Sequence, residues 1–271
     1  MNLTLLAHAP SIALKKYQIH KKIKSNPPEI IAVLCVYNEE LNIDSCLAHL
    51  EKYVDKIVVL DDCSTDNTVS IVKKHKKVST IIENKNKTSW KERQNRELVI
   101  KTAFNVAENK SNAWAFCVDA DERFEKRFLK DLKKITALIT TPIAVIHMRE
   151  LWGDIYHYRM DGIWSTKRKD LLFKLSDKMT FSYKNEHHIP WHYSEIDGQE
   201  TVLDYNFYHL KMIRPEDRKK RADLYNTLDP KKKMQSIGYD YLVDENNLFL
   251  EKIKRRNRYD YRFVPNYYKN F

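Results

Sequence analysis

The sequence predicts an α/β protein with a doubly wound, mostly parallel central sheet. Continuous apolar runs, typical of strands that are buried on both faces, alternate with segments whose apolar residues recur at helical spacing. The runs are 30–37, 56–60, 78–82 and 113–118, and the helical segments between them are 40–53, 67–75 and 90–109. Such alternation predicts parallel βαβ units, whose ligands bind beyond the carboxyl ends of the strands.

The second half of the chain is less regular and richer in Trp, Tyr and His. We expect strands at 142–149 and 171–175 and helices at 214–224 and 246–256. The predicted organisation is an N-terminal arm (1–28), one main domain (29–240, with halves 29–124 and 125–240), and a C-terminal helix with a basic, aromatic tail (241–271).

Glycine is scarce, and this excludes two common nucleotide sites. The chain of 271 residues has four glycines, all in its second half: Gly153, Gly162, Gly198 and Gly238. Rossmann turns and P-loops need glycine where the backbone approaches a phosphate, and neither motif is present. If the protein binds a nucleotide diphosphate, it must neutralise the phosphates in another way.

Charge and cysteine content indicate the partners and the compartment. The net charge of +11 favours an anionic partner, namely nucleic acid, an acidic membrane surface or an anionic glycan, although a merely solvated lysine-rich surface is the alternative. The four cysteines form no CxxC pair, as expected of free thiols in the cytoplasm. No apolar run reaches the roughly 18 residues that a membrane span needs. We expect a cytoplasmic protein, with peripheral contact at the inner membrane face left open.

Acidic clusters follow three of the predicted strands. They are Tyr37-Asn38-Glu39-Glu40, the segment 61–66 (DDCSTD), and Asp119-Ala120-Asp121-Glu122. Carboxylates gathered around one crevice repel each other, and a cation would relieve that repulsion. Two aspartates separated by a small alanine can reach one divalent ion, and hard oxygen ligands select Mg²⁺ or Mn²⁺. Such an ion can bridge a diphosphate.

These motifs together resemble the family 2 glycosyltransferases. YNEE at 37–40, DDCSTDNT at 61–68, KERQNREL at 91–98 and DADE at 119–122 occur in the family's order, each at the expected place beside a strand. The resemblance is strong from residue 30 to 124 and loose beyond. It implies a GT-A fold and a metal-dependent enzyme that uses a nucleotide-diphosphate sugar, with a UDP-sugar as the expected donor. The chain lacks the Asn-x-Gly turn that often precedes the family's Arg-x-Asn segment.

The resemblance also assigns roles to individual residues. It places Tyr37, Asn38 and Glu39 beside the base and ribose, and Asp62 as an acceptor for one of them. Arg93 and Asn95 would approach the base or the phosphates. Asp119 and Asp121 match the DxD motif, with Asp119 toward the donor and Asp121 on the metal. His209 resembles the late histidine that some GT-A enzymes use as a second metal ligand, and a buried core histidine is the alternative.

Family 2 enzymes invert the anomeric centre, so the resemblance implies a carboxylate base on the acceptor side. Glu186 is the first candidate, because it lies in a segment similar to a His-Glu segment of many relatives. Glu195 and Asp197 remain alternatives.

Other functions and acceptors stay open. A nucleotidyltransferase would need a glycine-rich loop near the first strand, and a non-catalytic module would not need intact carboxylates at three strand ends. The expected acceptor belongs to cell-surface glycan or lipopolysaccharide assembly, and a modified base in DNA is the alternative. The basic segment 252–262 would contact a membrane surface or a phosphate backbone, unless the tail's tyrosines simply pack on the domain.

Overall fold

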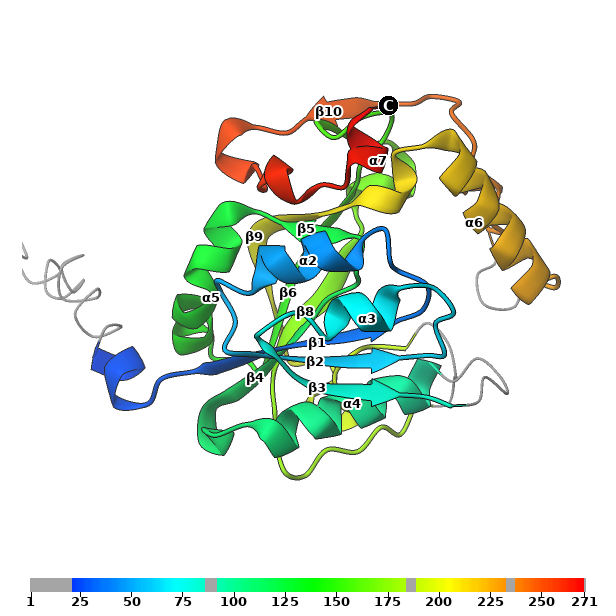
Figure 1. Cartoon of the computed structure of the whole chain (residues 1–271). Helices are drawn as coiled ribbons and strands as arrows, with labels where there is room; N and C mark the ends of the chain where they lie inside the picture. Colours follow the sequence, from blue (N-terminus) through cyan, green and yellow to red (C-terminus); the bar gives the residue numbers. More distant parts are fainter. Residues whose placement is uncertain (1–20, 86–91, 184–188, 233–236, 271) are drawn as a thin grey trace, which may run out of the picture.

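A central mixed sheet organises the molecule. Figure 1 shows the computed structural model, which describes residues 21–85, 92–183, 189–232 and 237–270. Eight strands form the sheet in the order β3-β2-β1-β4-β8-β6-β9-β5. The prediction of a doubly wound, mostly parallel α/β fold is confirmed.

The first four strands form the parallel part of the sheet. They are β1 (Glu29–Val36), β2 (Lys56–Asp61), β3 (Val78–Glu83) and β4 (Ala113–Cys117). β1 lies between β2 and β4, and nearly all of its residues are buried because both of its faces are covered. Each strand lies within one or two residues of its prediction, since continuous apolar runs mark strands of this kind.

The remaining strands bring the second half of the chain into the same sheet. They are β5 (Glu122–Phe124), β6 (Ile143–Glu150), β8 (Arg168–Lys174) and β9 (Glu200–His209). β8 runs antiparallel to both β4 and β6, β9 runs parallel to β6, and β5 pairs with the end of β9. A separate ribbon pairs β7 (His157–Arg159) with β10 (Leu250–Lys252).

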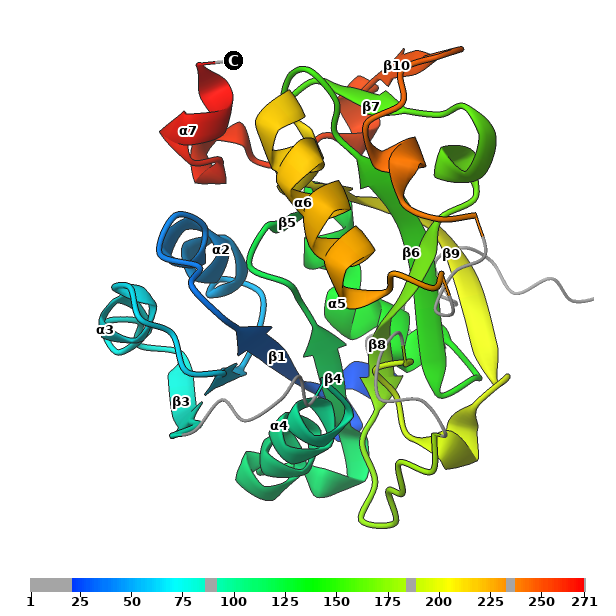
Figure 2. The same cartoon turned by 90° about the vertical axis from the view of Figure 1, so that its right-hand side faces the viewer.

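Helices cover both faces of the sheet (Figures 1 and 2). α2 (Ile43–Leu50), α3 (Thr68–Val72) and α5 (Lys126–Leu138) lie on one face, and α4 (Glu92–Val106) lies on the other. Two apolar cores result. Ile43, Leu47 and Phe128 contribute to the first, and Val99 and Ala103 contribute to the second.

The C-terminal part packs onto the main body instead of forming the predicted helix. Residues 246–256 contain β10 and the 3₁₀ turn Arg255–Asn257, so the helix prediction there is wrong. The apolar residues that suggested a helix lie instead in a short strand and in a third apolar core. The tail is anchored by Tyr259, Val264 and Tyr268, which are buried in that core.

Two α-helices and several 3₁₀ segments complete the described part of the fold. α6 (Pro215–Leu228) confirms the helix that was expected at 214–224, and α7 (Asn266–Lys269) lies near the end of the chain. The other 3₁₀ segments are Lys110–Asn112, Gly162–Ser165, Ser194–Ile196, Leu210–Met212, Asp240–Leu242 and Tyr261–Phe263.

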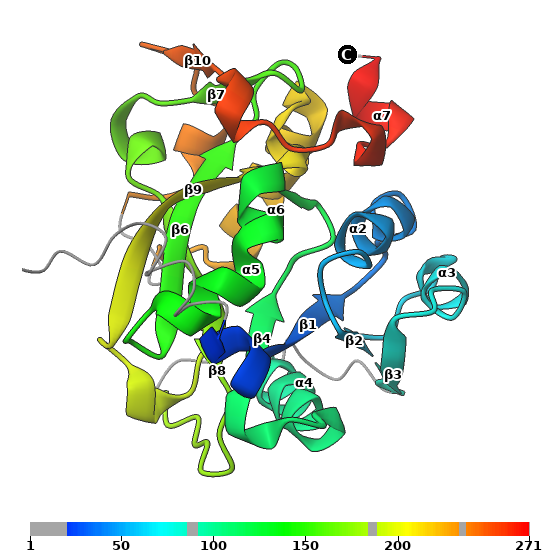
Figure 3. The same ribbon diagram turned by 90° about the vertical axis from the view of Figure 1, so that its left-hand side faces the viewer.

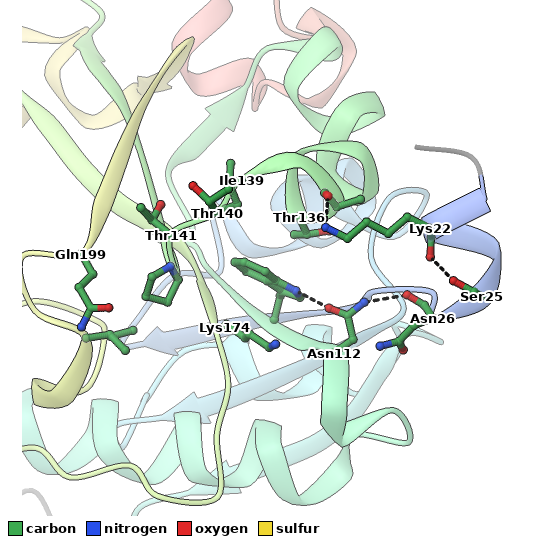
Figure 4. A pocket seen from close by; sticks show the side chains of 14 residues that line it. Lys22, Ser25, Asn26, Asn112, Thr136, Ile139, Thr140, Thr141, Lys174 and Gln199 are labelled. Atoms are coloured by element: carbon green, nitrogen blue, oxygen red, sulfur yellow. Dashed lines mark hydrogen bonds between the residues drawn. The ribbon is translucent and has the colours of Figure 1, made fainter. Parts of the chain in front are cut away.

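The amino edge of the sheet, which is turned toward the viewer in Figure 3, carries an open hollow of about 520 Å³, whose lining side chains are drawn in Figure 4. Lys22, from the helical residues 21–25, lines it together with Asn112, Trp114 and Lys174. Asn112 and Trp114 stand at the start of β4, so the hollow lies at the opposite edge from the carboxyl ends of the parallel strands. It is therefore separate from the acidic motifs.

Candidate functional site

The three acidic segments meet at the carboxyl edge of the parallel strands, which faces the viewer in Figure 2. β1, β2 and β4 are hydrogen-bonded neighbours, so the residues that follow them emerge side by side. The turns after β1 and β2 hold Asn38 (φ 51°) and Cys63 (φ 66°) in the left-handed region. Non-glycine residues adopt this conformation at a cost, and such residues gather at functional sites.

The first two motifs are tied together by hydrogen bonds. The backbone N–H of Asn38 donates to Oγ of Ser64 at 2.8 Å, and Oδ1 of Asn38 accepts from the N–H of Thr65 at 2.8 Å. The N–H of Glu39 donates to Oγ1 of Thr68 at 2.7 Å. Together these contacts make one rigid rim, whereas Tyr37 is 45% exposed beside it.

A polar chain links β2, β3 and α4 at the same edge. Nδ2 of Asn84 donates to Oδ1 of Asp62 at 2.9 Å and to Oδ1 of Asn95 at 3.1 Å. Asn95 is buried on α4, and Arg93, two residues earlier, is half-buried. The structure therefore brings together Asp62 and Asn95, which lie 33 positions apart in the sequence, through a residue that the sequence analysis did not assign.

Asp119 is held by a lysine from the antiparallel strand β8. Nζ of Lys169 donates to Oδ2 of Asp119 at 2.7 Å and to Oε1 of Glu122 at 2.6 Å. Burial raises the pKa of Glu122 to about 8 despite this contact. Burial acts in the same direction on Asp119, but the charge of Lys169 holds its pKa below the usual value. The repulsion expected between these carboxylates is thus relieved by a cation of the chain itself.

Asp121 and His209 lie together because two strands end beside each other. Glu122 pairs with His209 across β5 and β9, and the N–H of Leu210 donates to the carbonyl oxygen of Asp121 at 2.9 Å. Nε2 of His209 lies 2.5 Å from Oδ2 of Asp121. Both side chains are almost fully buried.

Glu150, at the end of β6, lies on the other side of the imidazole. Its Oε2 lies 2.7 Å from Nδ1 of His209, and Nζ of Lys167 donates to its Oε1 at 3.0 Å. Burial lowers the pKa of His209, but the charges of Asp121 and Glu150 outweigh burial and raise it to about 10.

Two further cations, which follow β9 in the sequence, approach this pair. Nζ of Lys211 lies 2.5 Å from Oε1 of Glu39 and 4.0 Å from Oδ2 of Asp121. Nη1 of Arg221, on α6, lies 3.4 Å from Nε2 of His209. Positive charge therefore surrounds the buried carboxylates.

The donor atoms at Asp121 and His209 fit a divalent metal. Oδ2 of Asp121 is buried and has no hydrogen-bond partner of normal geometry in the described part of the chain, although the imidazole is adjacent. A carboxylate oxygen beside an imidazole nitrogen suits Mn²⁺ better than Mg²⁺, which takes oxygen ligands. Within the described ranges no group of three or more His, Cys, Asp or Glu residues is placed to hold a metal. The remaining ligands of a metal ion would have to come from a bound molecule or from water.

The candidates for the catalytic base lie elsewhere. Glu186 falls outside the described residues. Glu195 accepts hydrogen bonds from the N–H and the hydroxyl of Thr180, and Oδ1 of Asp197 lies 3.8 Å from Nε2 of His192. Neither makes a contact with the DxD residues.

Comparison with known proteins agrees with this geometry. Residues 31–194 match the sequence model of a family described as "Glycosyl transferase family 2". The chain belongs to this family. The match spans β1, β2 and β4 with their acidic ends, and it stops before His209. The fold of the described part is accordingly GT-A.

Two curated relatives are glycosyltransferases. The SPbeta prophage-derived glycosyltransferase SunS of Bacillus subtilis (strain 168) is 25% identical over 190 residues, which cover 69% of this chain and 40% of the relative. Glycosyltransferase SunS of Bacillus phage SPbeta matches equally. The chain thus spans less than half the length of these curated relatives.

Among solved structures, mannosyl-3-phosphoglycerate synthase from Rubrobacter xylanophilus is 15% identical, with a TM-score of 0.37 over 49% of this chain and 44% of that chain. Glucosyl-3-phosphoglycerate synthase from Mycobacterium tuberculosis is also 15% identical, with a TM-score of 0.34 over 54% of this chain and 51% of that chain.

Proposed function

We propose that this family member transfers a sugar from a nucleotide-diphosphate sugar to an acceptor hydroxyl, with inversion at the anomeric carbon. The observation that carries the proposal is the arrangement of two polar clusters at one sheet edge. The Asp62–Asn84–Asn95 chain lies on the β2 side of β1, and the Asp119–Asp121–His209 group lies on the β4 side. A nucleotide held by the first cluster extends its diphosphate toward the second.

The first cluster supplies the nucleotide site of this proposal. Asp62 offers a carboxylate to the base or ribose, and Asn84 fixes its orientation. Tyr37 is exposed enough to pack against the base, and Asn38 and Glu39 form the rim. Arg93 would reach the base or the phosphates from α4. A UDP-sugar is the donor we propose to test first.

The second cluster supplies the metal and diphosphate site. Asp121 and His209 would hold Mn²⁺, or Mg²⁺ less favourably, and Asp119 would face the donor. A bound Mn²⁺ would act as a Lewis acid on the departing diphosphate. Lys211 and Arg221 lie beside the same pair and would neutralise phosphate charge. Lysine and arginine side chains here replace the glycine-rich loops that the chain lacks.

The proton of the acceptor hydroxyl needs a base on the open side of the site. We keep Glu186 as the proposed base, because Glu195 is already bound by Thr180 and Asp197 lies beside His192. Such a base takes the proton as the hydroxyl oxygen attacks the anomeric carbon, and it typically contributes a factor of about 10²–10⁴.

We propose a hydroxyl of a cell-surface glycan or lipopolysaccharide as the acceptor, consistent with the net charge of +11. We propose that this acceptor binds a basic surface that lies away from the catalytic edge. The N–H of Lys126, on α5, donates to the carbonyl oxygen of Arg258 at 3.1 Å, and this contact places the exposed side chains of Arg255 and Arg258 beside the exposed lysines of α5. In the described ranges no helix combines the length and apolar character needed to cross a bilayer.

A donor screen tests the proposal. The chain is incubated with Mn²⁺ and a panel of nucleotide sugars, and released nucleotide is measured with and without glycan acceptors and DNA. Release that requires Mn²⁺ and rises with a glycan acceptor supports the proposal. Transfer to DNA with a modified base would instead favour the other acceptor, and absence of release with every donor would favour a binding module.

A further inference from the structure

We infer that Glu150 is a positioning residue that orients His209 toward the metal. The inference rests on the proposed function, because it needs Asp121 and His209 as metal ligands. Glu150 lies outside every acidic motif of the sequence, on strand β6 in the second half of the main domain. Its contacts nevertheless connect it to the metal pair.

The sheet fixes the distance between Glu150 and His209. β6 and β9 run parallel, and these two residues pair in register at the ends of their strands. The N–H of Leu151 donates to the carbonyl oxygen of His209 at 3.2 Å, so the two backbones are locked together. Both residues are at most 3% exposed, and Oε2 of Glu150 lies 2.7 Å from Nδ1 of His209. Glu150 thus holds Nδ1 as the N–H donor.

This contact leaves Nε2 of His209 facing Asp121. A metal-binding imidazole typically donates its other N–H to a carboxylate, which fixes the tautomer and ring orientation and makes the ligand nitrogen more basic. Nε2 lies 2.5 Å from Oδ2 of Asp121, so the nitrogen is aimed at the other proposed ligand. The carboxylate of Glu150 therefore selects which ring nitrogen can bind the ion.

Lys167 in turn holds Glu150. Its Nζ donates to Oε1 at 3.0 Å and lies 4.1 Å from the ring centroid of Trp164. Both carboxylate oxygens are therefore engaged, one by the imidazole and one by the ammonium group. A purely structural ion pair between Glu150 and Lys167 is the competing explanation, and it predicts no effect on metal affinity.

Mn²⁺ binding by the whole chain without donor tests the inference. Free Mn²⁺ is counted by electron paramagnetic resonance during titration, with and without UDP, and folding is checked by near-UV circular dichroism. Glu150→Gln should weaken Mn²⁺ affinity by about 10- to 100-fold, the usual cost of losing such a partner. The matched control is Glu125→Gln, which removes another fully buried carboxylate, bound by Asn206 and Arg127. This control should bind Mn²⁺ like wild type.

The variants distinguish failure of the positioning role of Glu150 from failure of the proposed metal site. If His209→Ala loses Mn²⁺ affinity and a folded Glu150→Gln does not, the positioning role is overturned and the metal site stands. If Asp121→Asn and His209→Ala both bind like wild type, the proposed metal site itself fails. Should Glu150→Gln not fold, Glu150→Asp keeps the charge for Lys167 but draws the carboxylate back from Nδ1. Wild-type Mn²⁺ affinity in Glu150→Asp would then overturn the role.

Discussion

The ammonium group of Lys211 lies 2.5 Å from the carboxylate of Glu39, a residue 172 positions earlier in the chain. The same Nζ is 4.0 Å from Oδ2 of Asp121. Burial lowers the pKa of Lys211, but the charges of Asp121 and Glu39 outweigh burial and raise it, so this cation is permanent at physiological pH. Lys211 thus connects Glu39, in the motif after β1, to Asp121 in the DxD motif. Its ammonium group and a metal ion would both be attracted to the carboxylate of Asp121.

Replacing Lys211 with glutamine should therefore strengthen metal binding and weaken donor binding. Without donor, Mn²⁺ affinity should rise about tenfold, a modest part of the Coulomb energy of charges 4 Å apart in a partly solvated site. Nucleotide-diphosphate affinity should fall, because one phosphate partner is lost. Mn²⁺ titration and calorimetry with UDP measure both effects. Lys219→Gln, an exposed change on α6, is the control, and weaker Mn²⁺ binding in Lys211→Gln would contradict the account.

Asn84→Ala should impair nucleotide binding, because Asn84 connects Asp62 to Asn95. The variant loses two hydrogen bonds, each worth about 1 kcal/mol, so the Kd for UDP should rise by up to about 30-fold. Isothermal calorimetry measures it. Asn112→Ala removes a similar amide at the amino edge and should leave the Kd unchanged. Equal UDP affinities of Asn84→Ala and wild type would show that the nucleotide does not bind at this cluster.

Glu186→Gln should slow transfer far more than it weakens donor binding. The amide keeps the volume but cannot take the acceptor proton, so single-turnover transfer should fall by about 10²-fold or more. Glu195→Gln is the matched control, since Glu195 already accepts two hydrogen bonds from Thr180. If transfer slows in Glu195→Gln and does not slow in Glu186→Gln, then Glu195 is the base and Glu186 is not.

His49 should make the protein acid-sensitive. Burial lowers its pKa to about 3, and Nε2 accepts the N–H of Phe124 at 3.1 Å. Because this pKa lies below the unfolded value of about 6.5, the stabilisation is present above pH 6.5 and is lost as the pH falls toward 3. When the pH is lowered from 8 to 5, the free energy of unfolding should fall by about 2 kcal/mol because of this histidine.

Urea unfolding of wild type and His49→Gln at several pH values measures this loss. The glutamine can still accept the N–H of Phe124 but does not titrate, so its stability should fall less with acid. Parallel pH profiles for the two proteins would show that another group is responsible.

The first half of the main domain, residues 29–124, could be predicted from the sequence because its signals are local. Buried parallel strands such as β1 appear as continuous apolar runs, and the motifs directly follow them. The positions of Asp62 and Asp119 at one edge followed from this pattern together with the rule for parallel sheets, whereas Asn95 was assigned only through the family resemblance.

The second half could not be predicted as well, because its structure depends on distant partners. β9 pairs with β6, which lies more than fifty residues earlier, and its first residues alternate in burial instead of forming an apolar run. α5 was not predicted, although its buried residues recur at helical spacing. Lys169, Lys211 and Glu150 stand in no motif, so only the folded structure shows that they contact Asp119, Glu39 and His209, respectively.

Nucleotide release by wild type and Asp121→Asn tests the central claim most directly. The variant keeps the size of a buried side chain but removes the charge that faces His209 and Lys211. With Mn²⁺ and a panel of UDP-sugars, wild type should release UDP from at least one donor, and a chelator should abolish the release. Since metal assistance is worth several kcal/mol, Asp121→Asn should retain less than about a tenth of that rate. A folded Asp121→Asn that releases UDP at a rate close to wild type, or wild-type release that survives the chelator, would contradict the account.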